Sequence, residues 1–500
     1  MIIGAGLSGL AVGIALRDAG FKNFIIVERA SEIGGTWRDN SYPGIAVDVP
    51  AQTYQFSFAL KPDWSCMFAK GEEVRAYIDE VADRFALWPF IRTSSNVTAR
   101  HWNAALSRWE LTINGEVLTA RYVISATGPY VDPKDPKIPG IKNFRGEIMR
   151  SQTWNHNYDF TGRRVAVIGT GASAVQFIPI LAEKAAEMHV YQRTPIWVVP
   201  KLDPQTPEFV KALFRRAPVV QDAVRRGLTN ISENLLTAAV QRWHRPRTRR
   251  IVRVLTWLLR EVFYRRQVPD AALRRRLTPD YGLGCKRPAL SSRYLRTFMR
   301  PNVELVTDGI DRIVANGIRA RDGRVREVDV IVLATGFALA HDAETYANHP
   351  VRGRDGFDLE RFYRDEPARS YEGISMPGLP NHFMVLAPYG GTGGSWHGVP
   401  EAAGIHIVRV LTEARRRGCV VVEPREEAAE RWSAVMRERL DGSLLKRNSC
   451  ETSGAFWVDK NGHIPFLRAT SQAEAFHDHA DFPLDDYQYS VNLESQVVNQ

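Results

Sequence analysis

Two glycine-rich loops constrain the fold of this 500-residue chain more than any other feature. The first, Gly-x-Gly-x-x-Gly at residues 4–9, follows a short apolar strand and opens a helix that is predicted to end at Gly20. The second, Gly-x-Gly-x-x-Ala at residues 169–174, follows the apolar strand at 165–168. Such loops bring backbone N–H groups close to a pyrophosphate at a helix N-terminus. The chain is therefore predicted to be an α/β protein with two Rossmann-like dinucleotide-binding domains.

In each unit, a second strand follows the helix that the glycine loop opens. The residues at the end of this strand differ between the two units, which predicts different cofactors. In the first unit, FIIVE ends at Glu28, where a carboxylate accepts hydrogen bonds from ribose hydroxyls and repels a 2′-phosphate. In the second unit, MHVYQRT has no acid and supplies Arg193 and Thr194, which suit a 2′-phosphate. The first site therefore predicts FAD or NAD and the second predicts NADPH, although Arg193 could also be an ordinary surface arginine.

Composition and cysteine usage restrict the class of protein. A chain with 44% hydrophobic residues can bury a large core, and at this length we expect at least two domains. No apolar run reaches the roughly 20 residues of a membrane span, and the early glycine loop leaves no room for a signal peptide, so we expect a cytoplasmic protein. The scattered cysteines suggest no disulfide framework, zinc cluster or Cys-x-x-Cys pair, which argues against a disulfide reductase: Cys66, Cys285, Cys419 and Cys450.

The net charge of +10 is concentrated in one helical stretch, at about residues 205–278. Within it, IVRVLTWLLREVFYRR alternates apolar and basic positions at helical spacing. We favour a solvated helical insertion that packs one apolar stripe on the body of the protein, with a membrane-surface helix as the alternative. No nucleic-acid-binding motif accompanies the charge.

The stretch GGTWRDNSYPGIAVDVP is the most specific motif in the chain. It fits the pattern G-x-W-x-x-x-x-Y-P-G-x-x-x-D without a gap, from Gly35 to Asp48. The chain thereby resembles the class B flavoprotein monooxygenases, and among these the Baeyer–Villiger branch, because animal-type flavin monooxygenases usually share only the Gly-x-Trp part. The resemblance runs from Met1 to Gly336 and more loosely to about Tyr487.

The resemblance implies an NADPH-binding domain inserted into an FAD-binding domain. The expected division is 1–143 for the first part of the FAD domain, 144–329 for the NADPH domain with the helical insertion, and 330–500 for the remainder. VISATGPY and VIVLATGFA would mark the passages between the domains, although each is also consistent with a core strand and a glycine turn. A glycine-rich loop before a helix at 399 to about 417 would close over the flavin.

The Lys286-Arg287 pair falls on the family's KR pair. There the arginine lies beside the flavin and the lysine reaches the NADPH phosphate. Reduced flavin and oxygen form a C4a-peroxyflavin whose anion is the nucleophile, and a fixed guanidinium stabilises its charge. We expect Arg287 and Asp48 to be catalytic, with Asp48 holding the arginine by paired hydrogen bonds. The alternative is a structural ion pair at a domain junction.

The resemblance implies an FAD- and NADPH-dependent monooxygenase that inserts one oxygen atom of O2 into a ketone, giving an ester or lactone, or into a sulfide. Tyr54 and Val97 match flavin contacts, although both could be ordinary core residues. The FAD contacts are expected to be Gly4, Gly6, Ser8, Gly9, Glu28, Gly35, Thr36, Trp37, Asp48, Tyr54 and Val97. The NADPH contacts are expected to be Gly169, Thr170, Gly171, Ala172, Ser173, Ala174, Arg193, Thr194, Lys286 and Arg287. No metal site is expected, and Trp396, His397 and Trp457 are interpreted as packing residues that could also line the substrate cavity.

Two features depart from the family pattern. FRGEIMRSQTW fits F-x-G-x-x-x-H-x-x-x-W except that Arg150 replaces the histidine, and Asn155 follows where proline or aspartate is common. We expect a working interdomain linker with altered tuning. The first strand has only three residues before its glycine loop, so either it is shortened or the natural chain begins upstream, and we expect weak retention of FAD.

Two other functions remain open. The chain could be a relative that oxygenates nitrogen or sulfur and hardly acts on ketones, because such enzymes share most of these motifs. It could also be an uncoupled NADPH oxidase or a nucleotide-binding relic. The retained Lys286, Arg287 and Asp48 count against the relic, since nucleotide binding alone requires no arginine at the flavin.

Overall fold

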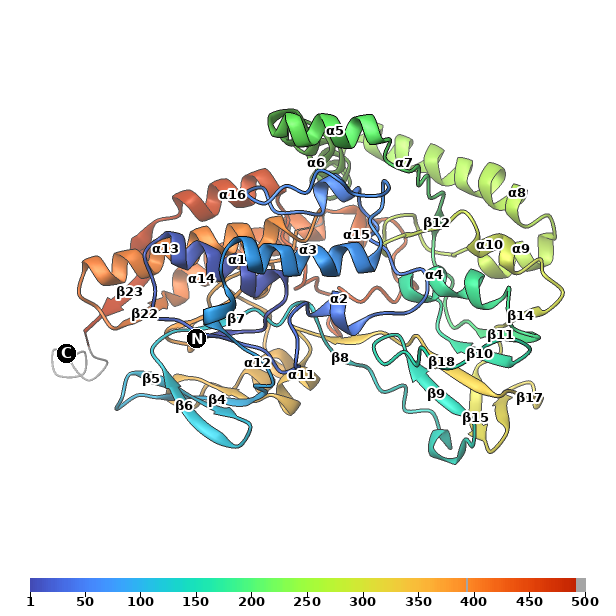
Figure 1. Cartoon of the computed structure of the whole chain (residues 1–500), viewed down its shortest axis with the longest axis horizontal. Helices are drawn as coiled ribbons and strands as arrows, with labels where there is room; N and C mark the ends of the chain where they lie inside the picture. The colour runs from blue at the N-terminus through green and yellow to red at the C-terminus, as the bar shows by residue number, and fades with distance from the viewer. Residues whose placement is uncertain (393, 492–500) are drawn as a thin grey trace.

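The computed structural model describes residues 1–392 and 394–491, and its framework is a pair of five-stranded parallel sheets (Figure 1). The first sheet has the order β21-β7-β1-β2-β3. Its strands are β21 (His382–Met384), β7 (Val123–Ser125), β1 (Ile2–Ile3), β2 (Ile26–Val27) and β3 (Ile91–Arg92). Since β21 comes from the last third of the chain, this sheet is built from two distant segments.

The second sheet has the order β14-β11-β10-β18-β9. Along the chain, its strands all lie between β7 and β21, so the second sheet is complete before the last strand of the first is added. Its strands are β14 (Val303–Val306), β11 (Glu187–Tyr191), β10 (Arg164–Ile168), β18 (Val330–Leu333) and β9 (Glu147–Arg150). The predicted division places β18 at the start of the second part of the FAD domain, whereas in the structure β18 pairs with β10 and β9. The chain therefore returns toward the first sheet after Leu333. The domain division itself stays a prediction, and its last residues, 492–500, lie outside the described part of the chain.

Two short strands connect the sheets. β8 (Tyr130–Pro133) follows the first Ala-Thr-Gly sequence, β19 (Phe337–Leu339) follows the second, and the two strands pair antiparallel. The outgoing and returning passages of the chain are thus held side by side. Each phosphate loop opens a helix, α1 (Leu7–Asp18) in the first unit and α4 (Ala172–Leu181) in the second.

Smaller elements surround the two sheets. A four-stranded sheet contains β4 (Val97–Asn103), β5 (Arg108–Ile113), β6 (Glu116–Ala120) and β20 (Val351–Arg352), and a three-stranded sheet contains β15 (Ile310–Val314), β16 (Gly317–Ala320) and β17 (Val325–Glu327). The helices on the first sheet's side of the molecule are α3 (Gly71–Arg84), α13 (Gly398–Arg416), α14 (Glu426–Asp441) and α16 (Gln472–Asp481). Among the helices of the described residues, none is long and apolar enough to cross a bilayer.

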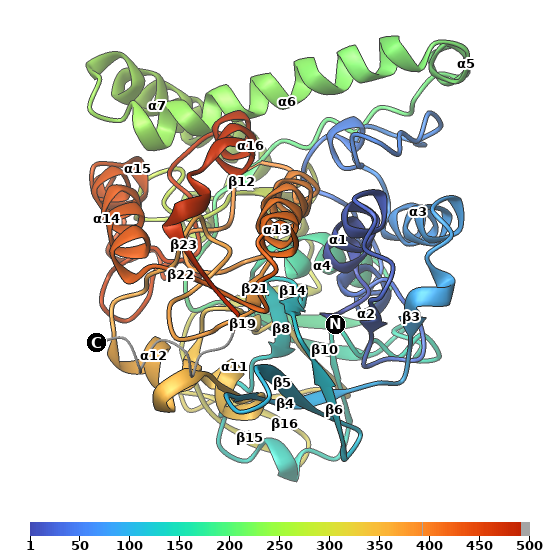
Figure 2. The same ribbon diagram turned by 90° about the vertical axis from the view of Figure 1, so that its left-hand side faces the viewer.

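The basic stretch forms helices on the outside of the molecule (Figures 1 and 2). They are α5 (Glu208–Arg216), α6 (Pro218–Gln241), α7 (Pro246–Leu258), a π-helical turn at Leu259–Tyr264, α8 (Arg265–Gln267) and α9 (Ala271–Leu277). The expected inward apolar stripe is present, because Val252, Leu259 and Phe263 pack on the body of the protein. A second apolar stripe, along α7 and the following turn, faces solvent.

The cysteines depart from expectation, because Cys285 and Cys450 form a disulfide across 165 residues of sequence. Cys66 and Cys419 are free. The pairing joins the segment before Lys286 to the C-terminal region, and no local spacing in the sequence indicates it.

Candidate active site between two phosphate loops

One cavity of about 1820 Å³ lies at the carboxyl ends of both parallel sheets. Its wall includes the residues that directly follow β1, β2, β7, β10, β11 and β18. This is where open α/β sheets bind ligands, because helix N-termini and loop N–H groups converge there. Of the expected site residues, all but Gly9 and Ala174 line this cavity.

Gly9 and Ala174 have a different task, which is to let a helix approach its strand. A Cβ atom on Gly9 would lie 1.9 Å from the carbonyl oxygen of Gly4, so no larger residue fits there. Ala174, at the equivalent place in the second loop, is fully buried. Gly171, in contrast, has nothing within 4 Å of the place where its Cβ would be, which leaves its backbone open to a ligand.

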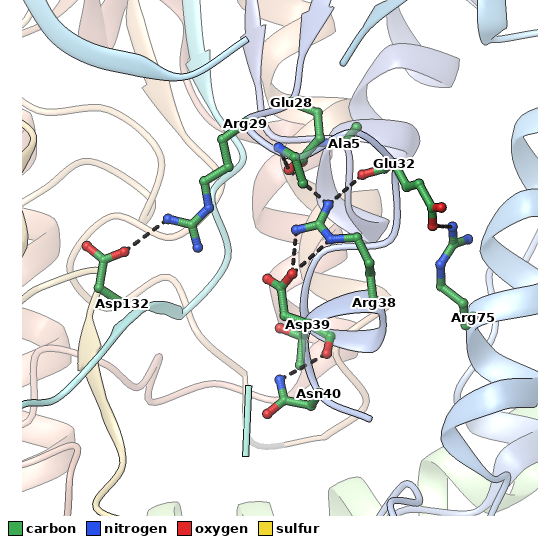
Figure 3. Close-up of polar contacts among 11 residues, drawn as sticks. Ala5, Glu28, Arg29, Glu32, Arg38, Asp39, Asn40, Arg75 and Asp132 are labelled. Atoms are coloured by element: carbon green, nitrogen blue, oxygen red, sulfur yellow. Dashed lines mark hydrogen bonds and ion pairs between the residues drawn. The ribbon is translucent and has the colours of Figure 1, made fainter. Parts of the chain in front are cut away.

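The Glu28 carboxylate is held at the end of β2 by three donors (Figure 3). Ala5, in the first loop, donates its backbone N–H to Oε2 at 2.9 Å, while Ala30 N–H and Arg38 Nη1 donate to Oε1 at 3.0 and 2.9 Å. Arg38, which no sequence motif indicates, also donates to Asp39 and lines the cavity. The acid is therefore oriented at the place where a ribose would lie.

Trp37 and Tyr54 form part of the wall beside the first loop. Trp37 Nε1 donates to the Tyr54 hydroxyl at 3.0 Å, and the two rings are nearly perpendicular. Burial raises the pKa of the Tyr54 phenol, so it stays protonated near neutrality. These aromatic faces fit a flat ring system such as a flavin.

Arg287 and Asp48 form a bidentate ion pair that faces the cavity. Arg287 Nε and Nη2 donate to the two Asp48 oxygens at 2.7 and 2.8 Å. The carboxylate raises the pKa of the Arg287 guanidinium above its ordinary value, so its charge is permanent. The side chains are 41% and 36% exposed, and both line the cavity. The predicted pairing is confirmed across 239 residues of sequence, while the catalytic role stays a prediction.

A second group of cations lies beside the second loop. Lys286 and Arg193 both line the cavity, and burial, followed by the charge of Arg193, lowers the pKa of the Lys286 ammonium. Neither is paired with a carboxylate among the residues that the structure describes. Two unpaired cations beside a phosphate loop fit the 2′-phosphate of NADPH.

The glycine-rich loop before α13 lies over the same cavity, with Thr392, Gly394 and Trp396 in its wall. Trp396 Nε1 donates to Ser8 Oγ in the first phosphate loop at 3.2 Å. The Thr392 hydroxyl is buried in the cavity wall and has no partner among the described residues, as expected of a group that faces a bound cofactor. Gly393, part of the expected loop, lies outside the described residues.

The other two candidates differ. Trp457 lines the cavity, whereas His397 does not and packs against Tyr54, Phe56 and Tyr77. Burial lowers the pKa of His397 to about 3, so it is neutral. His397 is thus a packing residue.

Glu233 is a cavity residue that the sequence did not reveal. It comes from α6, and its Oε2 accepts the backbone N–H of Gln472, the first residue of α16, at 2.8 Å. Burial raises its pKa. One of several acidic residues in a basic helical stretch carries no signal of such a position.

The altered linker motif is structurally intact. Trp154 is buried against Tyr42 and Phe177, and a Cβ atom on Gly146 would lie 2.3 Å from the Asp329 carbonyl oxygen. Arg150, the last residue of β9, donates through Nη1 to the Lys134 carbonyl at 3.0 Å, in the passage after β8. Arg150 thus links the second sheet to the interdomain connection.

Comparisons with known proteins agree with this architecture. Residues 1–245, which contain both phosphate loops, match the family described as pyridine nucleotide-disulphide oxidoreductase. A protein named Baeyer-Villiger monooxygenase from Pseudomonas aeruginosa (strain PAO1) is 36% identical, covering 90% of this chain and 84% of that protein. Another protein of that name, from Streptomyces coelicolor (strain A3(2)), is 35% identical, covering 99% and 93%.

Solved structures are similar over almost the whole chain. An oxidized steroid monooxygenase bound to NADP superposes with a TM-score of 0.85 at 26% identity, covering 98% of this chain and 99% of that one. A complex of OTEMO with FAD and NADP gives 0.84 at 26% identity, with 98% of both chains covered. An ε-caprolactone-bound cyclohexanone monooxygenase gives 0.80 at 26% identity, covering 98% and 99%.

Proposed function

This chain belongs to the Baeyer–Villiger monooxygenase family, and on that premise we propose that Arg287 and Asp48 carry its oxygen-transfer step. It is an FAD- and NADPH-dependent flavoprotein monooxygenase. The observation that carries the proposal is the Arg287–Asp48 pair in the wall of a cavity that both phosphate loops share. A permanently charged guanidinium at that place serves chemistry on oxygen rather than nucleotide binding alone.

We assign the two cofactors to different parts of the cavity wall, from the residues beside each phosphate loop. The first loop, with Glu28, would hold FAD, and the second loop, with Arg193, Thr194 and Lys286, would hold NADPH. FAD supplies the redox centre that accepts hydride from NADPH and activates O2. Glu28 would orient the FAD ribose, while Arg193 and Lys286 would select the 2′-phosphate.

Arg287 stabilises the negative charge that develops on oxygen during transfer, because its guanidinium is fixed in the cavity wall and always protonated. Asp48 acts by orientation, since two hydrogen bonds hold the planar guanidinium in one position. Trp396 forms part of the cavity wall, and the displacement of water from this wall by the bound cofactors would strengthen the electrostatic effect.

The proposed substrate is a small ketone, which is converted to an ester or lactone. The support comes from the relatives' names, from the lactone bound to the cyclohexanone monooxygenase, and from the aromatic part of the cavity wall. That part consists of Trp396, Phe456, Trp457 and Phe466. This aromatic surface suits an apolar ring, because such a ring gains binding free energy mainly from burial of its apolar surface and little from polar groups.

Product analysis tests this function. The FAD-loaded enzyme is given NADPH, O2 and, separately, a cyclic ketone, a thioether and a tertiary amine. We measure NADPH consumed, oxygenated product and hydrogen peroxide. We expect lactone from the ketone at more than half of the NADPH consumed. Product from the amine alone would indicate a nitrogen-oxygenating relative, and peroxide equal to NADPH with every substrate would indicate an uncoupled oxidase.

A further inference from the structure

The positive charge of the molecule resides in the outer helices. Residues 205–278 contain 17 arginine and lysine residues and five acidic residues, a net charge of +12, so the rest of the chain carries −2 of the total of +10. Helices α5, α6 and α7 lie along one outer edge of the molecule in both views (Figures 1 and 2). The outer surface of α5, α6 and α7 is therefore basic, and we call this surface the insertion face.

An apolar stripe lies on this face and points to solvent. Along α7 and the following turn, the exposed side chains fall at helical spacings of three and four residues, which places them on one side of the helix. They are Ile251 (58% exposed), Val254 (50%), Leu255 (45%), Leu258 (42%) and Val262 (53%), with Trp257 (58%) beside them. Solvated helical surfaces are normally polar, so the stripe indicates a contact that the isolated chain does not satisfy.

Four arginines lie on the same helix as the stripe, and helical spacing places Arg247 and Arg250 beside it. Arg247, Arg249, Arg250 and Arg253 are exposed, and none forms an ion pair with a carboxylate in the described part of the chain. Further large apolar side chains are exposed on the neighbouring helices, including Phe209 (75%) on α5 and Val219 (76%) on α6. The face thus combines unpaired cations with exposed apolar groups over several turns.

We propose that the insertion face docks on the surface of a bilayer that contains anionic lipids. A helix with an apolar stripe, flanking arginines and an exposed tryptophan lies in the headgroup region, where the stripe leaves water and the guanidinium groups meet phosphate. A helix of this length and charge lies on a membrane and does not cross it. A second copy of the chain fits less well, because two faces of +12 repel each other. Nucleic acid would leave the aliphatic stripe uncovered.

Vesicle co-sedimentation of the FAD-loaded full chain tests this. The probes are vesicles of phosphatidylcholine alone and of phosphatidylcholine with phosphatidylglycerol. We expect binding to the anionic vesicles that is at least about tenfold stronger than to the neutral ones, and that falls at high salt because exposed charges are screened. Equal or absent binding to both vesicles would overturn the proposal.

Exposed substitutions identify the surface without disturbing the core. Leu255→Asp/Leu258→Asp and Arg247→Gln/Arg250→Gln are each expected to weaken binding about tenfold or more. The matched controls are Leu106→Asp/Val117→Asp, at residues 55% and 61% exposed in the β4–β5 turn and on β6, and Arg296→Gln/Arg300→Gln outside the insertion. Both controls should bind like the parent.

Two measurements keep this test separate from folding and from self-association. Melting curves and NADPH turnover without vesicles should be unchanged in all four variants, since none of the changed residues lines the cavity. Equal loss of binding in the controls would overturn the assignment. A mass that doubles with concentration in light scattering, lost in Leu255→Asp/Leu258→Asp and without vesicle binding, would instead identify a contact between two copies.

Discussion

At the scale of single residues, the Arg287–Asp48 pair decides whether the cavity can perform oxygen transfer. Asp48→Asn keeps the shape of the side chain and removes its charge, so the guanidinium loses a charge-assisted partner. We expect ester formation to fall roughly tenfold to a hundredfold, with more peroxide per NADPH and little change in NADPH affinity.

The control for this variant is Asp311→Asn. Asp311 also pairs with an arginine, Arg319, at nearly the same exposure, but on the three-stranded sheet outside the cavity. It should leave activity unchanged. Ester yield in Asp48→Asn equal to that of the parent would show that the ion pair is only structural.

Lys286 should give NADPH binding a characteristic pH dependence. An ammonium is charged below its pKa, and burial beside Arg193 lowers that pKa. As the pH rises, Lys286 therefore loses its proton sooner than an ordinary lysine, and its attraction for the 2′-phosphate is lost. We expect KM for NADPH to rise between neutral and alkaline pH, while KM for NADH, which lacks this phosphate, stays nearly constant.

Lys286→Arg provides the matched test, because arginine stays charged over this range. The rise in KM for NADPH should be much smaller in this variant. The same rise in the parent and in Lys286→Arg would exclude Lys286 as the titrating group.

At the scale of elements, β9 is joined to the interdomain passages by one side chain. The Lys134 carbonyl accepts both Arg150 Nη1 and Thr335 Oγ1, so it connects the outgoing and returning passages to the second sheet. The family's histidine at this place is replaced by a longer, always charged donor. The motif has lost its usual residue but keeps a hydrogen bond across the same junction.

Arg150→Ala should weaken the coupling of NADPH oxidation to ester formation and leave the stability of the fold nearly unchanged. The lost hydrogen bond is exposed, so the free energy of unfolding should change by at most about 1 kcal/mol. Without this hydrogen bond, the position of the NADPH-binding domain during turnover should be less well defined. We therefore expect less ester and more peroxide per NADPH. Arg145→Ala, an exposed arginine in the same segment, is the control. Unchanged coupling in Arg150→Ala would show that the linker does not depend on this contact.

At the scale of the whole molecule, the Cys285–Cys450 disulfide ties the segment that carries Lys286 and Arg287 to the C-terminal region. A bond that closes so long a loop can stabilise a protein by up to about 5 kcal/mol. We expect dithiothreitol, or Cys450→Ser, to lower the melting temperature by about 5 to 10 °C. Cys419→Ser changes a free cysteine and should have no such effect. Four free thiols by mass spectrometry in the untreated protein would contradict the pairing.

The two nucleotide units, their different strand ends and the Lys286-Arg287 motif could be predicted from the sequence, because each is encoded in a strand, loop and helix adjacent in the chain. The glycine of a phosphate loop is required by local backbone geometry, and the acid or arginine after the next strand follows at a regular spacing. For the same reason Gly9 and Ala174 belong to the motif although they do not reach the cavity.

Only the tertiary structure decided the features that depend on contacts distant in the chain. The Cys285–Cys450 bond spans 165 residues, Glu233 reaches the cavity from an outer helix, and β18 joins the second sheet through pairing with β10 and β9. Periodicity in the basic helices predicted an apolar stripe but not its surroundings. Helical spacing determines which side chains share a face, whereas the packing of the whole chain determines which face is covered.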